Sequence, residues 1–278
     1  MRIGDIDIGV IMDGTFRLDA GSMFGIVPKS AWKDQVKTDR RNRMTLGLNC
    51  FLIRSGKTNI LVDTGVGTKH TASRKSRYAM SGGKLAKELS LLGLSPSDIH
   101  VVVLTHLHFD HAGGCTYLNS KNIATPFFPK AQYLVQHDDW NEATHPNERT
   151  RAGYFSDDFI PLEREKQIEL VEGEVEITSR VKISRTGGHT AGHQGVFIES
   201  RGQRAASLGD LLPTELHLPI PFTTAWDLNP IEGLLKKKEV LLQAEKEQWL
   251  LLFGHGYPGQ AGYLERLDER LILRGISL

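Results

Sequence analysis

Short hydrophobic runs bounded by turn residues predict strands in both halves of the chain. In the first half these runs cover positions 7–12, 47–53 and 59–62, and Asp-Gly, Ser-Gly or Asp-Thr-Gly follows closely after each. We expect them to form a β-meander in which Asp13-Gly14 makes the first turn. A second series of strand-like runs covers 167–171, 175–177, 181–184, 195–198 and 205–208.

Helices and central strands are predicted between and after these runs. Leucines at 85, 89, 91 and 92 indicate a helix over 82–93, and a second helix is expected over 230–247. Residues 100–104 form a continuous, largely β-branched run, which is typical of a strand buried on both faces. Further strands are predicted at 131–135 and 249–253.

The order of strands, helix and strand therefore occurs twice. This order predicts an α/β fold of two similar halves, with two sheets packed face to face and helices outside. We expect one domain that covers residues 1–278.

Composition narrows the class of protein without naming a function. The 278 residues are 40% hydrophobic and 24% charged, with a formal net charge of +1. No global field therefore draws the chain to nucleic acid or to an anionic membrane, although a local basic patch is compatible with this balance. No run of about 18 apolar residues is present. With early acidic residues and only two cysteines, we expect a cytoplasmic protein without a secretory signal or a disulfide framework.

The histidines indicate the chemistry. His106, His108, Asp110 and His111 lie within six residues, directly after the predicted buried strand 100–104. Ligand sites in α/β proteins lie at such strand ends. Residues two apart on an extended segment point the same way, so His106 and His108 can reach one metal ion. Imidazole nitrogen and carboxylate oxygen are ligands that Zn²⁺ accepts.

Three isolated residues complete the predicted cluster. His189 follows Gly187-Gly188, Asp210 follows Gly209, and His255 lies between two glycines. We expect His106, His108 and His189 at one metal ion and Asp110, His111 and His255 at another, with Asp210 bridging the two. Three protein ligands and one bridge leave an open position at each ion, which is typical of a catalytic site.

These residues resemble the metallo-β-lactamase-fold superfamily of metal-dependent hydrolases. The resemblance rests on the run His106–His111, followed in order by His189, Asp210 and His255, and on the earlier element Asp63-Thr64-Gly65. It implies a four-layer αβ/βα sandwich with a dinuclear metal site at one edge. The Gly188–His193 pattern and the chain length are most similar to the branch of N-acyl-homoserine lactonases and small organophosphate hydrolases.

The predicted chemistry is hydrolysis by a hydroxide that bridges two divalent ions. Two such ions can lower the pKa of a shared water to near neutrality and polarise a carbonyl or phosphoryl oxygen. We expect Asp110 to orient the hydroxide and carry a proton to the leaving group. Zinc is the expected metal, although the ligand types also suit manganese, cobalt and iron. Asp63 either fixes an imidazole or caps a strand end.

The substrate is less clearly indicated than the metal site. Lactonases of the resembling branch carry a tyrosine three residues after the bridging aspartate, where this chain has Pro213. Thr214 or His217 could supply a hydrogen-bond donor instead, although His217 between two leucines is also typical of a packed core residue. Phe24 and Phe109 are candidate walls of the substrate pocket, with His217 as a further candidate contact.

Three interpretations remain open at this point. The first is a dinuclear hydrolase that acts on a small ester, lactone or related electrophile, including phosphotriesters. The resemblance also implies a homodimer. The second is a mononuclear iron oxygenase similar to persulfide dioxygenases. The third is a binding protein that has kept the fold, against which the complete ligand set argues.

Overall fold

Two seven-stranded sheets form the centre of the molecule, which a computed structural model describes for residues 1–258, 261–268 and 270–276. The first sheet has the order β1-β2-β3-β4-β5-β8-β9, antiparallel up to β4 and parallel from β4 to β9. Its strands are β1 (Arg2–Ile3), β2 (Ile6–Asp19), β3 (Arg43–Ser55), β4 (Thr58–Val62), β5 (Val101–Val103), β8 (Gln132–Gln136) and β9 (Ile168–Val171).

The second sheet comes from the second half of the chain and runs in sequence order. All its neighbours are antiparallel except β13 and β14, which are parallel because α8 connects them. Its strands are β10 (Glu174–Thr178), β11 (Val181–Arg185), β12 (Gln194–Ser200), β13 (Gln203–Ser207), β14 (Leu250–Leu252), β15 (Ala261–Leu267) and β16 (Arg270–Gly275). A separate hairpin pairs β6 (Thr116–Leu118) with β7 (Ala124–Pro126).

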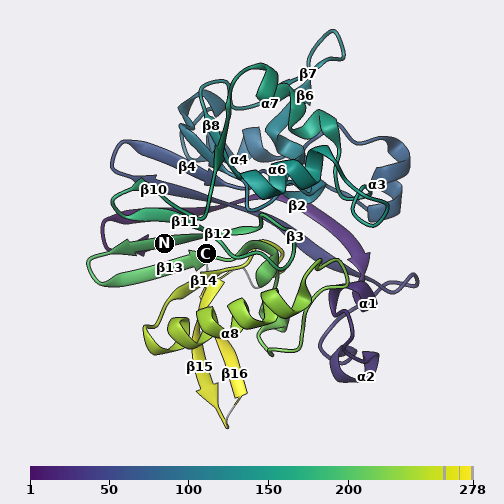
Figure 1. Cartoon of the computed structure of the whole chain (residues 1–278), viewed down its shortest axis with the longest axis vertical. Helices are drawn as coiled ribbons and strands as arrows, with labels where there is room; N and C mark the ends of the chain where they lie inside the picture. The colour runs from purple at the N-terminus through teal and green to yellow at the C-terminus, as the bar shows by residue number, and fades with distance from the viewer. Residues whose placement is uncertain (259–260, 269, 277–278) are drawn as a thin grey trace.

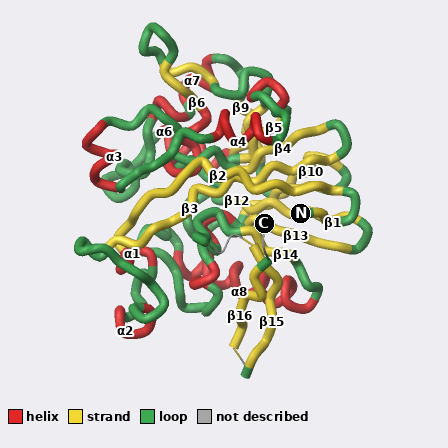
Figure 2. The backbone as a smooth tube through the Cα atoms, turned by 180° about the vertical axis from the view of Figure 1, so that it is seen from behind, coloured by secondary structure: helices red, strands yellow, loops and turns green. Residues whose placement is uncertain are grey.

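Helices cover the outer faces of both sheets. Figure 1 shows α4, α6 and α7 beside the first sheet and α8 across the second, while Figure 2 shows the strands between them. The α-helices are α1 (Ala20–Met23), α2 (Lys29–Trp32), α3 (Ala72–Tyr78), α4 (Leu85–Leu91), α5 (Phe109–Ala112), α6 (His137–Thr144), α7 (Ile160–Arg164) and α8 (Pro230–Lys246). Short 3₁₀ turns lie at Pro96–Asp98, Gly113–Cys115, Ser156–Asp158, Gly209–Leu211 and Glu215–His217.

The layers follow from where the hydrophobic side chains are buried. Phe51 and Val103 of the first sheet pack with Val196 and Leu252 of the second, which places a core between the sheets. Separate cores lie under α4, α6 and α7 on one side and under α8 on the other. The molecule is therefore a four-layer αβ/βα sandwich, the architecture that the resemblance implied.

One predicted turn is wrong. Asp13-Gly14 does not reverse the chain, because β2 continues to Asp19 with a register shift between Met12 and Gly14. The carboxylate of Asp13 instead accepts hydrogen bonds from distant backbone amides, including those of Gly83 at 2.9 Å and Lys84 at 2.8 Å. The Asp-Gly pair thus ties the start of α4 to the sheet.

In the part of the chain that the structure describes, no helix is long and apolar enough to cross a membrane.

Candidate metal centre

The first ligand segment leaves the carboxyl end of β5 and enters α5. His106 and His108 lie on the extended stretch before the helix, and Asp110 and His111 lie within it. Asp63, at the end of β4, holds this segment in place, because its Oδ1 accepts from the Thr105 backbone amide at 2.8 Å. The two neighbouring parallel strands β4 and β5 therefore end at the same point, as the sequence predicted for a site at a strand end.

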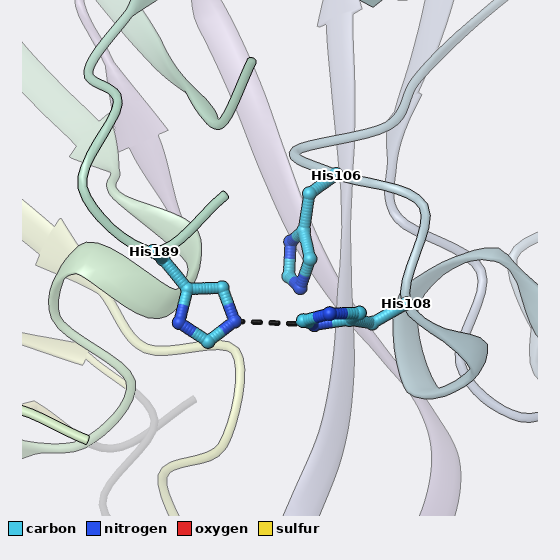
Figure 3. Close-up of side chains that lie close together, drawn as sticks. All are labelled: His106, His108 and His189. Carbon is cyan, nitrogen blue, oxygen red and sulfur yellow. Dashed lines mark hydrogen bonds between the residues drawn. The ribbon is translucent and has the colours of Figure 1, made fainter. Parts of the chain in front are cut away.

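The loops that follow β11 and β13, and the loop that follows β14, bring the remaining candidate ligands to this segment. Figure 3 shows His189 directed at His108, with His189 Nε2 3.1 Å from His108 Nδ1 and His106 beside them. Three groups of side chains have their ligand atoms within 4.8 Å of one another: His106, His108 and His189; His106, His111 and Asp210; and Asp110, His111 and His255.

Asp210 lies between the two histidine groups. Its Oδ2 is 3.4 Å from His189 Nε2, whereas its Oδ1 is 3.2 Å from His255 Nε2 and 3.4 Å from His111 Nε2. One carboxylate thus offers one oxygen to each group, which is the arrangement a bridging ligand needs. The Asp210 backbone amide donates to His193 Nε2 at 3.0 Å, so His193 positions this residue.

Divalent ions fit these residues because buried ligand atoms lack other partners. Among the described residues, His106 Nε2 and Asp210 Oδ1 are buried without a hydrogen bond. Leaving such atoms unsatisfied in the interior costs about 1–3 kcal/mol each. Ions bound to these atoms would remove that cost. The nitrogen and oxygen donors are those that zinc and similar ions accept.

Hydrogen bonds behind the cluster fix the imidazole tautomers. His111 Nδ1 lies 2.9 Å from the Asp63 carboxylate, and His189 Nδ1 lies 2.8 Å from the Asp227 carboxylate. His255 Nδ1 lies 2.9 Å from the backbone carbonyl of Gly47. Because these partners accept hydrogen bonds, each Nδ1 carries the proton and each Nε2 directs a lone pair into the cluster. Asp63 therefore performs both roles that the sequence left open.

The electrostatics of the metal-free cluster also favour a cation. Burial lowers the pKa of His106 and of His108 well below the ordinary value, so both imidazoles are neutral and available as ligands. Burial alone would also lower the pKa of His111, but the carboxylates of Asp210 and Asp63 raise it well above its usual range. The carboxylates thus attract positive charge to the place where the imidazole nitrogens meet.

A cavity of about 230 Å³ opens onto this cluster. Its polar lining includes His108, Asp110, His189, Asp210 and His255. The other walls come from six separate segments, and their side chains are largely apolar. The residues that form these walls include Leu18, Met23, Tyr78, Phe109, Glu142, Arg149, Thr150, Trp226 and Leu228.

The three predicted pocket residues differ in position. Phe109 lines the cavity. Phe24 and His217 do not line it: both are fully buried and stack on each other, with ring centres 5.1 Å apart. His217 Nε2 lies 2.8 Å from the Met23 carbonyl, so this pair supports Met23, which does reach the cavity. The interpretation of His217 as a packed residue therefore agrees with its position.

The expected replacement for the tyrosine at position 213 is also absent from the cavity. Thr214 Oγ1 is 2.8 Å from His217 Nδ1, and neither residue lines the described cavity. The Pro213 carbonyl accepts from the His255 backbone amide at 3.0 Å, so this position holds the last ligand loop through its backbone. Tyr78 and Thr150 supply the hydroxyl groups among the described lining residues.

Sequence reasoning missed the residues that hold the ligands from behind. Asp227 lies in a loop without a ligand pattern, and Asp139 lies on α6, which the sequence did not predict. Asp139 Oδ2 accepts from the Leu107 amide at 2.7 Å, and its Oδ1 accepts from Thr190 Oγ1. One carboxylate on α6 thus joins the first ligand segment to the loop of His189. The close sequence neighbours Asp138 and Asp139 give no signal of which one is buried.

The chain is similar to known proteins in sequence and in fold. Residues 45–255 match the sequence model of the Metallo-beta-lactamase superfamily. An N-acyl homoserine lactonase of Bacillus sp is 27% identical over 231 residues, which cover 77% of this chain and 82% of the relative. The N-acyl homoserine lactonase AiiB of Agrobacterium fabrum is 26% identical over 277 residues, with 92% of this chain and 95% of the relative covered.

Solved structures extend the likeness to the complete chain. A probable metal-dependent hydrolase from Staphylococcus aureus superposes over 100% of both chains with a TM-score of 0.91 and 30% sequence identity. AidC, a dizinc quorum-quenching lactonase in complex with a product, has a TM-score of 0.80 over 100% of this chain and 97% of its own. At 19% identity, the likeness to AidC concerns the fold alone.

Proposed function

Because the chain belongs to the metallo-beta-lactamase superfamily, and its named relatives are hydrolases, we propose that it hydrolyses a small ester or lactone with two divalent metal ions. The observation that carries this proposal is the position of Asp210, with one carboxylate oxygen facing His189 and the other facing His111 and His255. One group is His106, His108 and His189, and the other is Asp110, His111 and His255.

The side chains at the cavity floor have distinct tasks. Divalent ions held there would lower the pKa of a bound water and polarise the carbonyl oxygen of the substrate. Asp110 lines the cavity, and its Oδ2 lies 3.6 Å from His255 Nε2, at the edge of the cluster. We assign Asp110 to orient the attacking water, take up its proton and pass it to the leaving oxygen.

The apolar walls favour a small carbon-based substrate. Leu18, Met23 and Phe109 exclude water from the space above the ligands. Water exclusion strengthens the interaction between the cavity floor and charge that develops on the substrate. Because Pro213 has no donor side chain, we assign the contact with the substrate carbonyl to Tyr78 or Thr150, the hydroxyl groups of the lining.

Metal content and a substrate panel test this function together. We expect two divalent ions per chain, and turnover of lactones or aryl esters in preference to phosphotriesters. His108→Ala and Asp210→Asn should abolish metal-dependent turnover while the protein stays folded. His145→Ala is the matched control, because His145 is exposed and outside the cluster.

Two results would overturn the proposal. Unchanged turnover in His108→Ala or Asp210→Asn would remove the metal centre from the reaction. One iron per chain, no zinc, and oxygen uptake with a thiol substrate would assign the protein to the oxygenase alternative.

A further inference from the structure

Positive charge is concentrated on two segments near one end of the sheets. Residues 29–43 and 69–78, here called the basic rim, hold ten of the 34 Lys and Arg but only two of the 33 Asp and Glu. The remainder of the chain carries 24 Lys and Arg against 31 Asp and Glu. A nearly neutral protein therefore has a strongly positive region and a compensating negative remainder.

The basic rim lies beside the entrance to the cavity. Figure 1 shows α1, α2 and α3 on the same side of the molecule, with α3 above α1 and α2, and Figure 2 shows this side from behind. Arg43 joins the two segments, since its Nη1 donates to the carbonyls of Ser76 and Arg77. Tyr78, the last residue of α3, and Leu18, which precedes α1, line the cavity itself.

Most cations of the basic rim are not neutralised by a neighbour. The Lys69 side chain is 7% exposed and pairs with Asp158 at 3.0 Å, and Arg43 is paired with Asp39 at 2.8 Å. Arg74 packs on Phe155, 3.6 Å from the ring centre, and Phe155 contacts the cavity wall at Phe109. Among the described residues, seven exposed cations of the rim form no ion pair: Lys29, Lys33, Lys37, Arg40, Arg41, Lys75 and Arg77.

One further cation lies at the cavity itself, whose lining also holds the carboxylates of Asp110, Glu142 and Asp210. Arg149 is the single Lys or Arg of its described lining, and Arg149 Nη2 donates to the carbonyls of Ala225 at 2.8 Å and Asp227 at 3.2 Å. These bonds hold the guanidinium at the cavity wall. The Glu142 carboxylate, which also lines the cavity, already accepts from Tyr154 Oη and from the Ala191 amide.

We propose that the basic rim and Arg149 select an anionic substrate, namely an ester or lactone that carries a carboxylate or similar group away from its scissile bond. The proposal deepens the function above and rests on it. A neutral substrate gains nothing from a positive entrance, whereas charged entrances raise association rates of oppositely charged ligands by about 10-fold to 1000-fold.

Two esters of equal acyl length test the proposal with the metal-loaded full chain. Mono-p-nitrophenyl glutarate ends in a carboxylate, and p-nitrophenyl pentanoate ends in a methyl group. The readout is the ratio of their kcat/KM values. We expect the ratio to favour the glutarate ester at low salt and to fall at least fivefold as ionic strength rises from about 0.01 M to about 0.15 M, which shortens the Debye length from about 30 Å to about 8 Å.

Charge-reversal variants separate the effect of the basic rim on substrate selection from the effect of net charge. The rim variant is Lys37→Glu/Arg40→Glu/Lys75→Glu. The matched control is Lys57→Glu/Lys121→Glu/Lys238→Glu, three exposed lysines outside the rim that make the same change in net charge. The rim variant should lower the ratio at least fivefold at low salt with little effect on the neutral ester. The control should keep the ratio within twofold, and Arg149→Gln should raise KM for the glutarate ester alone.

The following outcomes would overturn the proposal. A wild-type ratio near one, or equal losses in the rim and control variants, removes the rim from substrate selection while the hydrolase function stands. Rim-dependent retention of duplex DNA at physiological salt, with an unchanged ester ratio, assigns the rim to a macromolecule. If neither ester, nor any lactone of the panel, is hydrolysed, the proposed function fails and this proposal fails with it.

Discussion

Asp139 is the residue whose loss tests most directly how the ligand loops are held. Its buried carboxylate accepts from the Leu107 amide, which lies between two candidate ligands, and from Thr190, which follows His189. Among the described residues, no hydrogen bond or ion pair joins Asp139 to a candidate ligand side chain. Truncation to alanine therefore removes the support of two loops and leaves the ligands themselves in place.

The size of the effect follows from these two hydrogen bonds. Asp139→Ala leaves the Leu107 amide buried and unsatisfied, which costs about 1–3 kcal/mol of folding stability. Loss of a group that orients metal ligands lowers metal affinity by about 10-fold to 100-fold. Burial raises the pKa of Asp139 to about 7, against the hydrogen bond from Thr190, so a neutral amide of the same shape suits this position. Asp139→Asn should therefore cost less than about 1 kcal/mol.

Zinc affinity by competition with a chromophoric chelator, together with urea unfolding, measures both effects. Asp138→Ala is the matched control, since Asp138 is the next residue and its side chain is 58% exposed. We expect alanine at 139 to weaken zinc binding at least tenfold relative to the control, and asparagine to restore most of it. Equal affinities of Asp139→Ala and Asp138→Ala would refute the role of Asp139.

Three further predictions concern metal removal, pH and one glycine. Chelation by EDTA should lower the unfolding temperature in calorimetry, because His111 Nε2 and His255 Nε2 lie 3.1 Å apart and would lose the metal ion that stabilises them in this position. Metal at about 1000 times its Kd should restore about 4 kcal/mol of unfolding free energy, and an unchanged temperature would contradict the site. Burial lowers the pKa of His217 to about 4, below its unfolded value of about 6.5, so its contribution to stability is present above pH 6.5 and lost as pH falls toward 4. Wild type should lose about 2–3 kcal/mol more than His217→Gln between pH 7 and pH 4.5 in urea unfolding, and parallel pH curves would argue against this. Gly209→Ala should unfold the chain, since its Cβ would lie 2.6 Å from His193 Nε2 at a φ of +48°, whereas Gly202→Ala, with φ +74° and open space, should cost only about 1–2 kcal/mol in the same assay.

Local signals explain which elements could be predicted. The helix expected over 230–247 is α8 (Pro230–Lys246), because Asn229 caps it and Pro230 suits its first position. The prediction of a turn at Asp13-Gly14 was wrong because the Asp13 carboxylate accepts hydrogen bonds from four distant backbone amides, those of residues 67 and 83–85. The hairpin of β15 and β16 and the short helix α6 were not predicted, since their apolar residues show no clear period.

The candidate metal ligands could also be predicted from local sequence signals. His106 to His111 are close in sequence, and the glycines beside His189, Asp210 and His255 mark positions where the backbone turns sharply. Asp227 and Asp139 gave no such signal, because their partners lie 38 and 32 residues away and are brought to them only in the folded chain. Pattern reasoning thus finds groups that converge within one segment, whereas the groups that orient them are set by tertiary contacts.

The residues that line the substrate cavity are also brought together by tertiary contacts. The cavity walls include the end of β2, the end of α3, the segment 149–153 and the segment 225–228, and no pair of these is adjacent in sequence. Pro213 illustrates the consequence: its carbonyl holds the His255 loop, so the side chain at this position is free to differ without disturbing a ligand. The metal centre therefore constrains the backbone around it, and the walls and the basic rim are where members of this superfamily can diverge in substrate. In this chain the entrance lies beside the cations of the basic rim.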